Sequence, residues 1–306
     1  MALYRCRAQI FTDLLQVGRS ITRSLATGRT LLSTRPPSPA ADADKYVETT
    51  QARGVRRIIL SHPSTRNSLS LGMMSAIMHN LTHDGDNPEL RSVVILAVPG
   101  SVFSAGHNLK ELKSSDGESH HRRVFETCAQ LMKAIADCPV PVIAAVDGLA
   151  AAAGCQLVAA CDIVVATERS SFSTPGANFG IFCSTPGIPL VRNVPKKVAA
   201  HMLFTGLPIS AHEAHQAGLV SKLVSTDSLE REVDKITNAI SEKSRSVLRL
   251  GKRFVKEQLE VDTDTAYSLG TEIMVNNLKL KDAQEGISSF SEKRKPSWTH
   301  GYDEDK

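Results

Sequence analysis

Histidines are the side chains of this sequence that most often bind metals, and their spacing decides whether they can do so together. His79 and His83 stand four residues apart on an expected helix, and His212 and His215 stand three apart on another. Such spacings place two imidazoles on one face of a helix. Neither pair has a third ligand at motif spacing, so we expect polar helix faces and no metal site.

The cysteines are the second group that could do chemistry. They show no CxxC spacing and stand mostly in apolar surroundings, which indicates buried thiols in a reducing compartment and not a disulfide framework. They are Cys6, Cys128, Cys138, Cys155, Cys161 and Cys183. Cys183 could act as a nucleophile, although a lone cysteine is more often a small buried hydrophobe, and both interpretations stay open.

Apolar runs predict the elements that position these residues. Continuous β-branched runs at 93–98, 142–146 and 163–166 predict strands buried on both faces of a sheet. A β-like stretch covers 47–60, and helical spacing covers 71–81, 118–136 and 150–160. Strands that alternate with helices predict an α/β core. From about residue 186 onward the pattern is helical, with segments at 198–204, 210–217, 229–240, 246–259, 265–278 and 283–290.

The charge of the chain is concentrated at its beginning. The net charge is +4. The first 35 residues contain one acid, Asp13, and six arginines, which are Arg5, Arg7, Arg19, Arg23, Arg29 and Arg35. A segment rich in arginine and hydroxyl residues and poor in acids is typical of a mitochondrial transit peptide, the alternative being a disordered tail. The remainder is close to neutral, so we expect no nucleic-acid partner.

The longest apolar run, 140–153, is shorter than the roughly 20 residues that span a bilayer, so we expect no membrane span. We therefore predict a transit peptide and linker at 1–44, a core at 45–240 and a helical C-terminal part at 241–306. The mature protein is expected in the mitochondrial matrix.

Five motifs follow one another between Val55 and Pro296. They are HPSTRNSL at 62–69, FSAGHNLKEL at 103–112, PVPVIAAVDG at 139–148 continued by GCQL at 154–157, FSTPG at 172–176, and FSEKRKP at 290–296. In order and spacing they resemble the enoyl-CoA hydratase (crotonase) superfamily. The resemblance implies a ββα spiral core, a helical C-terminal part used in trimer contacts, and acyl-CoA thioesters as ligands without a further cofactor.

The resemblance assigns an oxyanion hole to the backbone amides of His107 and Ala153. Two preorganised N–H donors stabilise the negative oxygen of a thioester enolate. A backbone amide survives any side-chain change, so the hole can persist if the alanines before Gly154 need no positive φ.

Both glutamates that the resemblance would require are replaced, by Gln156 and by Gly176. A general acid or base contributes about 10²–10⁴-fold to a rate, so we expect no catalytic acid or base of the family type and little hydratase activity. Replacing both residues by glutamate is expected to raise hydration. The alternative is an enzyme of different chemistry, such as an isomerase, thioesterase or decarboxylase, on the same oxyanion hole.

Basic residues in two motifs match positions that lie near the coenzyme A phosphates in the superfamily. They are Arg66, Lys293 and Lys295, for which a solvated basic surface is the alternative. The resemblance thus implies acyl-CoA as the small-molecule partner, a homotrimer or hexamer, and a link to fatty-acid metabolism.

Overall fold

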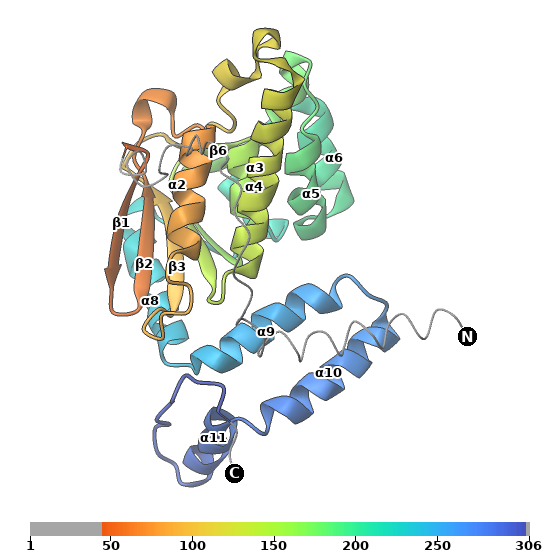
Figure 1. Cartoon of the computed structure of the whole chain (residues 1–306). Helices are drawn as coiled ribbons and strands as arrows, with labels where there is room; N and C mark the ends of the chain where they lie inside the picture. Colours follow the sequence, from red (N-terminus) through yellow and green to blue (C-terminus); the bar gives the residue numbers. More distant parts are fainter. Residues whose placement is uncertain (1–44, 304–306) are drawn as a thin grey trace, which may run out of the picture. The chain divides into compact units, whose positions relative to one another are not determined.

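Two sheets and the helices packed on them make up residues 45–303, the part of the chain that this computed structural model describes (Figure 1). The predictions on residues 1–44, including the transit peptide and Cys6, lie outside the described residues.

The larger sheet contains the strands that the apolar runs predicted. Its order is β1-β2-β3-β5-β7-β10, with β1 antiparallel to β2 and the other pairs parallel. The strands are β1 (Val47–Ala52), β2 (Val55–Leu60), β3 (Ser92–Ala97), β5 (Val142–Val146), β7 (Ile163–Thr167) and β10 (Lys222–Val224). Every residue of β5 is buried, as expected for a strand covered on both faces.

The smaller sheet has the order β4-β6-β8-β9. Its strands are β4 (Val102–Ser104), β6 (Leu149–Ala151), β8 (Ser171–Ser173) and β9 (Ile209–Ser210). The first three pair in parallel and follow β3, β5 and β7 directly along the chain. Each turn of the chain therefore adds one strand to each sheet, which confirms the predicted ββα spiral.

The segment predicted as a helix from residue 150 divides into two elements. Ala150 and Ala151 pair with Phe172 and Ser173 in the small sheet, and α4 (Ala153–Ala160) begins only afterwards. Alanine favours helix, but cross-strand pairing overrides so weak a preference. The strand end and the helix start therefore lie two residues apart, which brings the helix N-terminus to the edge of the small sheet.

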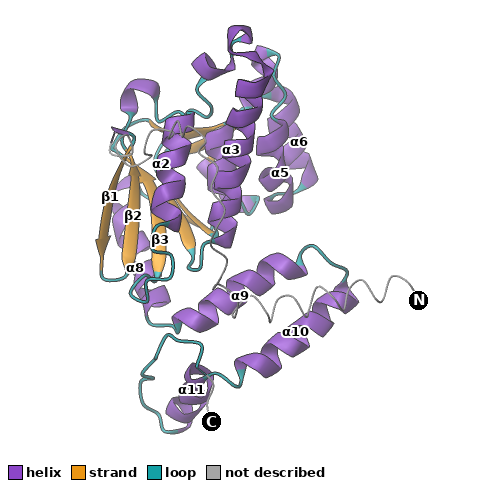
Figure 2. Ribbon diagram, in the orientation of Figure 1, coloured by secondary structure: helices purple, strands orange, loops and turns teal. Residues whose placement is uncertain are grey.

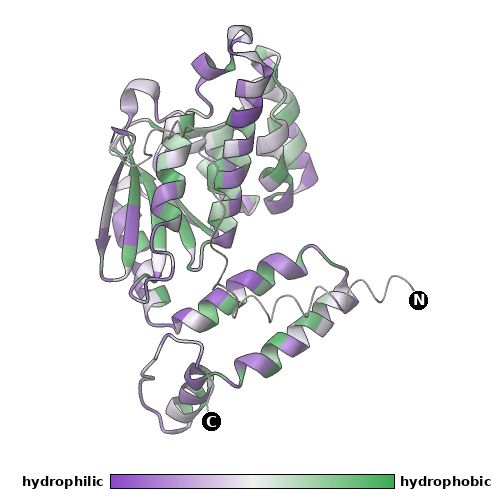
Figure 3. Cartoon of the chain, in the orientation of Figure 1, coloured by the Kyte–Doolittle hydropathy of each residue, from purple (hydrophilic) through white to green (hydrophobic). Residues whose placement is uncertain are grey.

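Helices cover both faces of the large sheet (Figure 2). The core on one face includes α2 (Leu71–Thr82), α3 (Gly117–Asp137) and α4, while α8 (Leu229–Ser241) packs through Val233 against Val94, Ile143 and Val165 on the other. Figure 3 shows apolar residues concentrated along the strands and on the helices packed against them. Among residues 45–303, no helix has the length and apolar character needed to cross a bilayer.

The remaining helices follow in chain order. They are α5 (Ser184–Asn193), α6 (Lys196–Thr205), α7 (Ala211–Gln216), α9 (Arg245–Gln258), α10 (Thr263–Asn277) and α11 (Lys281–Ser291). The predicted helical C-terminal part is confirmed, and Figure 1 shows α11 next to α9 and α10. Lys252 of α9 ties this part to the core, because its ammonium group lies 2.6 Å from the carboxylate of Asp162.

Candidate functional site

A cavity of about 120 Å³ lies where the loop after β4 meets the N-terminus of α4. Apolar side chains form most of its wall, and no carboxylate is among them. The lining residues are Ala105, His107, Leu109, Leu112, Phe125, Ala152, Ala153, Pro175, Gly176, Phe179, Ile181, Phe182, Cys183, Thr185 and Pro186.

The two predicted oxyanion amides both belong to residues that line this cavity. Ala153 is the first residue of α4, so its N–H has no acceptor within the helix. Within residues 45–303, neither the His107 amide nor the Ala153 amide donates to a protein acceptor. Both residues therefore stand in the cavity wall with N–H groups that no described acceptor occupies.

Gly106 allows the two amide-bearing segments to approach each other. Its φ is +89°, and a Cβ added there would lie 2.8 Å from the carbonyl oxygen of Ala151 and 3.1 Å from the nitrogen of Ala153. Only glycine fits this conformation and this space. The loop itself is held by the Leu69 N–H, which donates to the Gly106 carbonyl at 2.7 Å.

Ala152, between the strand and the helix, has a backbone conformation that alanine rarely adopts. Its φ and ψ are 49° and −118°, so the condition that the alanines need no positive φ is not met. Two hydrogen bonds hold it there, because its N–H donates to Ser173 at 2.9 Å and its carbonyl accepts from Gln156 at 3.0 Å. This turn orients the N–H of Ala153.

The His107 side chain forms part of the cavity wall. Nδ1 lies 3.4 Å from the Leu69 carbonyl oxygen, and the ring meets Phe125 edge-on with centroids 5.3 Å apart. Nε2 is buried and has no partner among the described residues. Burial lowers the pKa of His107. The hydrogen bond to the Leu69 carbonyl raises the pKa but offsets only part of this effect, so the ring is neutral near pH 7.

Gln156 is not among the residues that line the cavity. It is buried within α4, and its Oε1 accepts a weak hydrogen bond from the Cys128 thiol of α3 at 3.7 Å. Burial raises the pKa of Cys128 to about 12, so this partner stays protonated. The amide thus joins α3 and α4.

Gly176 does line the cavity, but the loop around it leaves no room for a side chain. A Cβ at this position would lie 2.1 Å from the carbonyl oxygen of Ile181. The Gly176 N–H donates to the Cys183 sulfur at 3.3 Å, and burial raises the pKa of that thiol. Of the two interpretations of Cys183, the structure therefore favours a buried thiol that holds the loop in place, and not a nucleophile.

The predicted coenzyme A cations lie in two different places. Arg66 is exposed and lines a neighbouring cavity of about 360 Å³ beside Pro99 and Gly100. Its carbonyl accepts the Ala105 N–H at 3.0 Å, which connects it to the His107 loop. Lys293 and Lys295 are exposed beyond the end of α11 and line neither cavity.

Sequence reasoning missed the walls of the cavity. Phe125 of α3, Phe182 and Pro186 line it, although helical spacing within 118–136 could have assigned Phe125 to a partly buried face. It also missed Glu111, whose carboxylate accepts the Leu71 N–H at 3.1 Å and so caps α2.

The histidine pairs form no metal site in the described residues. His79 and His83 stack on each other at the end of α2, with centroids 5.3 Å apart. Within 45–303, no three histidine, cysteine, aspartate or glutamate side chains come together as metal ligands would.

Comparisons with known proteins show which proteins this chain is similar to. Residues 50–301 match the family described as "Enoyl-CoA hydratase/isomerase". Enoyl-CoA hydratase domain-containing protein 3, mitochondrial, of Xenopus laevis is 54% identical over 250 residues, which are 82% of this chain and 85% of the relative. The Homo sapiens protein of that name is 51% identical over 269 residues, 87% of this chain and 88% of the relative.

Solved structures show the same similarity. The crystal structure of human enoyl-CoA hydratase domain-containing protein 3 aligns with a TM-score of 0.81 and 51% identity, over 83% of this chain and all of that chain. An enoyl-CoA hydratase from Bacillus anthracis aligns with a TM-score of 0.79 and 28% identity, covering 84% of this chain and 100% of that chain. These matches confirm the resemblance that the five motifs predicted.

Proposed function

The chain belongs to the enoyl-CoA hydratase/isomerase family, and we propose that it binds acyl-CoA thioesters without hydrating enoyl groups. The observation that carries this proposal is a cavity whose wall includes His107 and Ala153, whose backbone amides donate to no acceptor within residues 45–303, and includes no carboxylate. Two such donors suit a thioester carbonyl oxygen, and the apolar wall suits an acyl chain.

The lack of hydration follows from what stands at the two replaced positions. General acid–base catalysis needs a titratable group within hydrogen-bond reach of the reacting atoms. Gln156 is an amide bound to Cys128 outside the cavity wall, and Gly176 carries no side chain. Neither position offers a proton donor or acceptor that works near neutral pH.

Arg66 supports the coenzyme A part of the proposal. Its carbonyl is bonded to the loop that carries His107, and its exposed guanidinium can meet phosphate groups beside the cavity. Lys293 and Lys295 are exposed and remain candidates for the same role.

We further propose a homotrimer or a dimer of trimers in the mitochondrial matrix, with a role in fatty-acid metabolism. The names of the two relatives include the word mitochondrial. Leu259, Tyr267 and Met274 of the C-terminal part expose large apolar side chains, as an interface between subunits would require.

The test incubates the purified protein with a panel of acyl-CoAs and follows both binding and turnover. A ligand that binds only the native state stabilises it by RT ln(1 + [L]/Kd), so acyl-CoA is expected to raise the Tm while crotonyl-CoA is not hydrated. Arg66→Ala should weaken binding, whereas Arg192→Ala, an exposed arginine of α5, serves as the matched control. No Tm shift with a millimolar panel contradicts the proposal, as does hydration at the rate of a working hydratase.

One observation favours a second candidate, an acyl-CoA isomerase, thioesterase or decarboxylase. His107 and Cys183 are the titratable side chains in the cavity wall, and burial keeps Cys183 a thiol. The imidazole of His107, whose pKa burial lowers, is therefore the group able to accept a proton. His107→Gln retains the backbone amide, so under this candidate it abolishes turnover of the panel and preserves binding. Turnover that is unchanged in His107→Gln contradicts the candidate.

A further inference from the structure

Asn67 connects the Arg66 turn (residues 62–67) to strand β4. Only 2% of Asn67 is exposed, and both polar atoms of its side chain are hydrogen-bonded. Nδ2 donates to the Phe103 carbonyl of β4 at 3.1 Å, and Oδ1 accepts the His62 N–H at 2.9 Å. Because the first partner is an acceptor and the second a donor, the amide group has a single favourable orientation.

Two further hydrogen bonds join the same two segments. The buried hydroxyl of Ser104 donates to the Asn67 carbonyl at 2.8 Å, and the Ala105 N–H donates to the Arg66 carbonyl at 3.0 Å. Together with the side-chain amide, these bonds hold the end of β4 and the loop that carries His107 against the Arg66 turn.

The Arg66 turn has a backbone conformation that few residues adopt. Arg66 and Asn67 both have a positive φ, at 55° and 50°. Asparagine tolerates this region better than most residues, whereas arginine has no such preference. The Asn67 N–H closes the turn, because it donates to the His62 carbonyl at 3.0 Å. The hydrogen bonds of Asn67 therefore stabilise a turn that Arg66 disfavours.

The turn and the loop carry the two parts of the proposed ligand site. Arg66 is exposed beside the neighbouring cavity and is proposed for the coenzyme A phosphates, whereas the His107 amide is proposed for the thioester oxygen. Two groups reinforce each other on one ligand only when the distance between them matches that ligand. Asn67 also lines the neighbouring cavity, but protein groups already bond both polar atoms of its side chain, so it acts through its neighbours.

We infer that Asn67 is a positioning residue, which holds the Arg66 turn against the His107 loop so that one acyl-CoA molecule binds at both places. This inference rests on the proposed function, since it concerns how two parts of the same ligand are bound. It assigns Asn67 a role in affinity that is separate from its contribution to stability.

The experiment measures Kd by calorimetry for octanoyl-CoA, which is saturated and therefore cannot be hydrated. Asn67→Asp keeps the size of the side chain and the acceptor for His62, but it loses the donor to Phe103. Joining two binding groups in the correct geometry raises affinity by about 10²–10⁴-fold, so a partial loss of that geometry should raise Kd by about tenfold. Ser104→Ala removes another bond between the same segments, should raise Kd in the same way, and provides the test if Asn67→Asp does not fold.

The Arg66→Ala background shows whether the effect depends on Arg66. If Asn67 acts by holding the Arg66 turn, Asn67→Asp should raise Kd by less than about threefold in this background, because the group that it positions is gone. A purely structural role would lower the Tm and leave the two changes independent of each other.

Asn80→Asp is the matched control. Asn80 is a partly buried residue of α2 whose Nδ2 also donates to a carbonyl, that of Ala76 at 2.9 Å, and it lines neither cavity. This change removes the same kind of donor and should leave Kd unchanged. Thermal unfolding shows that each variant is folded at the temperature of the measurement.

The outcomes separate this inference from the proposed function. An unchanged Kd in Asn67→Asp and Ser104→Ala overturns the inference and leaves acyl-CoA binding intact. An equal increase in Kd with and without the Arg66 side chain also overturns it, because Asn67 would then act independently of Arg66. Failure of the wild-type chain to bind octanoyl-CoA or any other acyl-CoA contradicts the proposed function itself.

Discussion

The backbone of Ala152 is strained at the turn that precedes α4. With φ at 49° its Cβ crowds the following carbonyl oxygen, and such a conformation costs on the order of 1–3 kcal/mol for a non-glycine residue. The turn nevertheless persists because the Ser173 and Gln156 bonds fix both sides of the residue. After this turn Ala153 begins α4 with a free N–H, and Ala153 is one of the residues that line the cavity.

We predict that Ala152→Gly stabilises the protein. Relief of backbone strain exceeds the roughly 0.4–1 kcal/mol that glycine costs through the unfolded chain, so the free energy of unfolding should rise by about 1 kcal/mol. Ala151→Gly is the control, because Ala151 is in β6 without a positive φ, and glycine there should destabilise. Urea denaturation measures both, and destabilisation by Ala152→Gly would show that the turn is not strained.

The geometry at Gly176 bears on one expectation drawn from the motifs. Replacing Gln156 and Gly176 by glutamate was expected to raise hydration, but a Cβ at 176 would lie within 2.1 Å of the Ile181 carbonyl. In this loop conformation any side chain at 176 must first displace the Ile181 backbone, which argues against a gain in hydration.

We therefore predict that the double variant Gln156→Glu, Gly176→Glu does not hydrate crotonyl-CoA. Even Gly176→Ala should lower stability by about 1–3 kcal/mol through overpacking. Gly251→Ala provides the control, since Gly251 lies within α9 and an added Cβ there meets no atom within 4 Å. That change should stabilise the helix by roughly 0.5–1 kcal/mol. A double variant that folds and hydrates would show that the loop opens readily.

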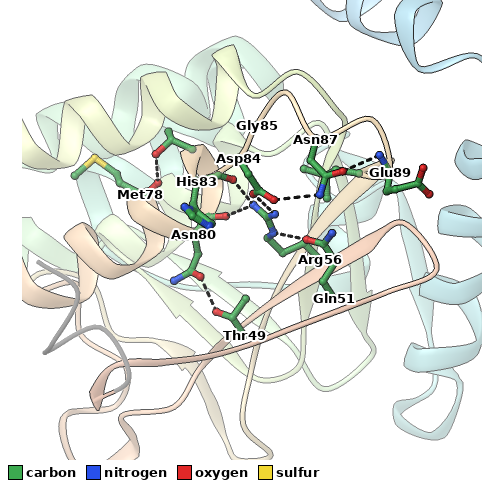
Figure 4. A network of polar contacts seen from close by, with 12 residues as sticks. Thr49, Gln51, Arg56, Met78, Asn80, His83, Asp84, Gly85, Asn87 and Glu89 are labelled. Atoms are coloured by element: carbon green, nitrogen blue, oxygen red, sulfur yellow. Dashed lines mark hydrogen bonds and ion pairs between the residues drawn. The ribbon is translucent and has the colours of Figure 1, made fainter. Parts of the chain in front are cut away.

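At the scale of elements, Arg56 joins β2 to the end of α2 (Figure 4). Its guanidinium donates to the carbonyls of Asn80 at 2.9 Å and His83 at 2.8 Å, and it pairs with Asp84. The side chain is 5% exposed, and it satisfies carbonyls that have no partner within the helix. Its hydrogen bond holds the pKa of Asp84 below the usual range.

We predict that Arg56→Met lowers the free energy of unfolding by about 2–3 kcal/mol, because two helix-end carbonyls and the Asp84 carboxylate lose the buried guanidinium that binds them. The adjacent Arg57 offers a matched control. It reaches Glu230 at 2.6 Å and Asp234 at 3.1 Å, both of them largely exposed, so Arg57→Met should cost less than about 1 kcal/mol. Equal effects of the two changes in chemical denaturation would contradict this ranking.

A buried carboxylate fixes the last segment of the chain to the C-terminal helices. Asp282 of α11 accepts the N–H groups of Thr299 at 2.7 Å and His300 at 2.9 Å, and the hydroxyl of Ser244, the N-cap of α9. Burial alone would raise the pKa of Asp282, but these hydrogen bonds outweigh it and lower the pKa.

The lowered pKa of Asp282 gives a pH dependence of known sign. A carboxylate whose pKa is depressed by folding contributes stability above its unfolded pKa of about 3.9, and loses that contribution as pH falls through the folded value. Asp282→Asn should therefore be less stable than the wild type at pH 7, and the difference should shrink below about pH 4. Denaturation as a function of pH measures this, and a difference that grows toward acid pH would contradict it.

The sequence predicts a helix or strand well where the residues of that element alone carry its apolar pattern. The runs at 93–98, 142–146 and 163–166 predicted β3, β5 and β7 to within one residue at each end, because strands covered on both faces are apolar throughout. The short strand β6 was missed, since alanines carry no strand signal and only pairing with β8 makes them one.

The cavity, too, could be predicted from the sequence only in part. The motifs named His107, Ala153 and Gly176 as neighbours, and all three line one cavity. They could not reveal that Gln156 turns toward Cys128, because that contact joins two helices distant in the chain. Nor could they reveal that the Ile181 carbonyl closes over Gly176, because that depends on the exact conformation of the loop.

At the scale of the whole molecule, α9 and α10 contact each other and leave apolar side chains uncovered. Leu259, Tyr267 and Met274 are 71%, 76% and 62% exposed, and a cavity of about 860 Å³ lies among the residues of this helix pair. Monomeric proteins rarely expose so many large apolar residues together. The proposed trimer would bury them.

We predict that the double variant Tyr267→Glu, Met274→Glu is monomeric, whereas the wild type sediments as a trimer or hexamer. Two charges at an apolar interface would have to be buried unpaired, which costs several kcal/mol and exceeds the margin of most assemblies. Phe204→Glu is the comparison, because Phe204 is 70% exposed on α6, away from this helix pair in the chain. It should leave the oligomer intact if α9 and α10 form the interface. Sedimentation velocity measures the oligomeric state, and thermal unfolding shows whether each variant folds. A monomeric wild type contradicts the proposed trimer, and dissociation by Phe204→Glu alone would place the interface at α6.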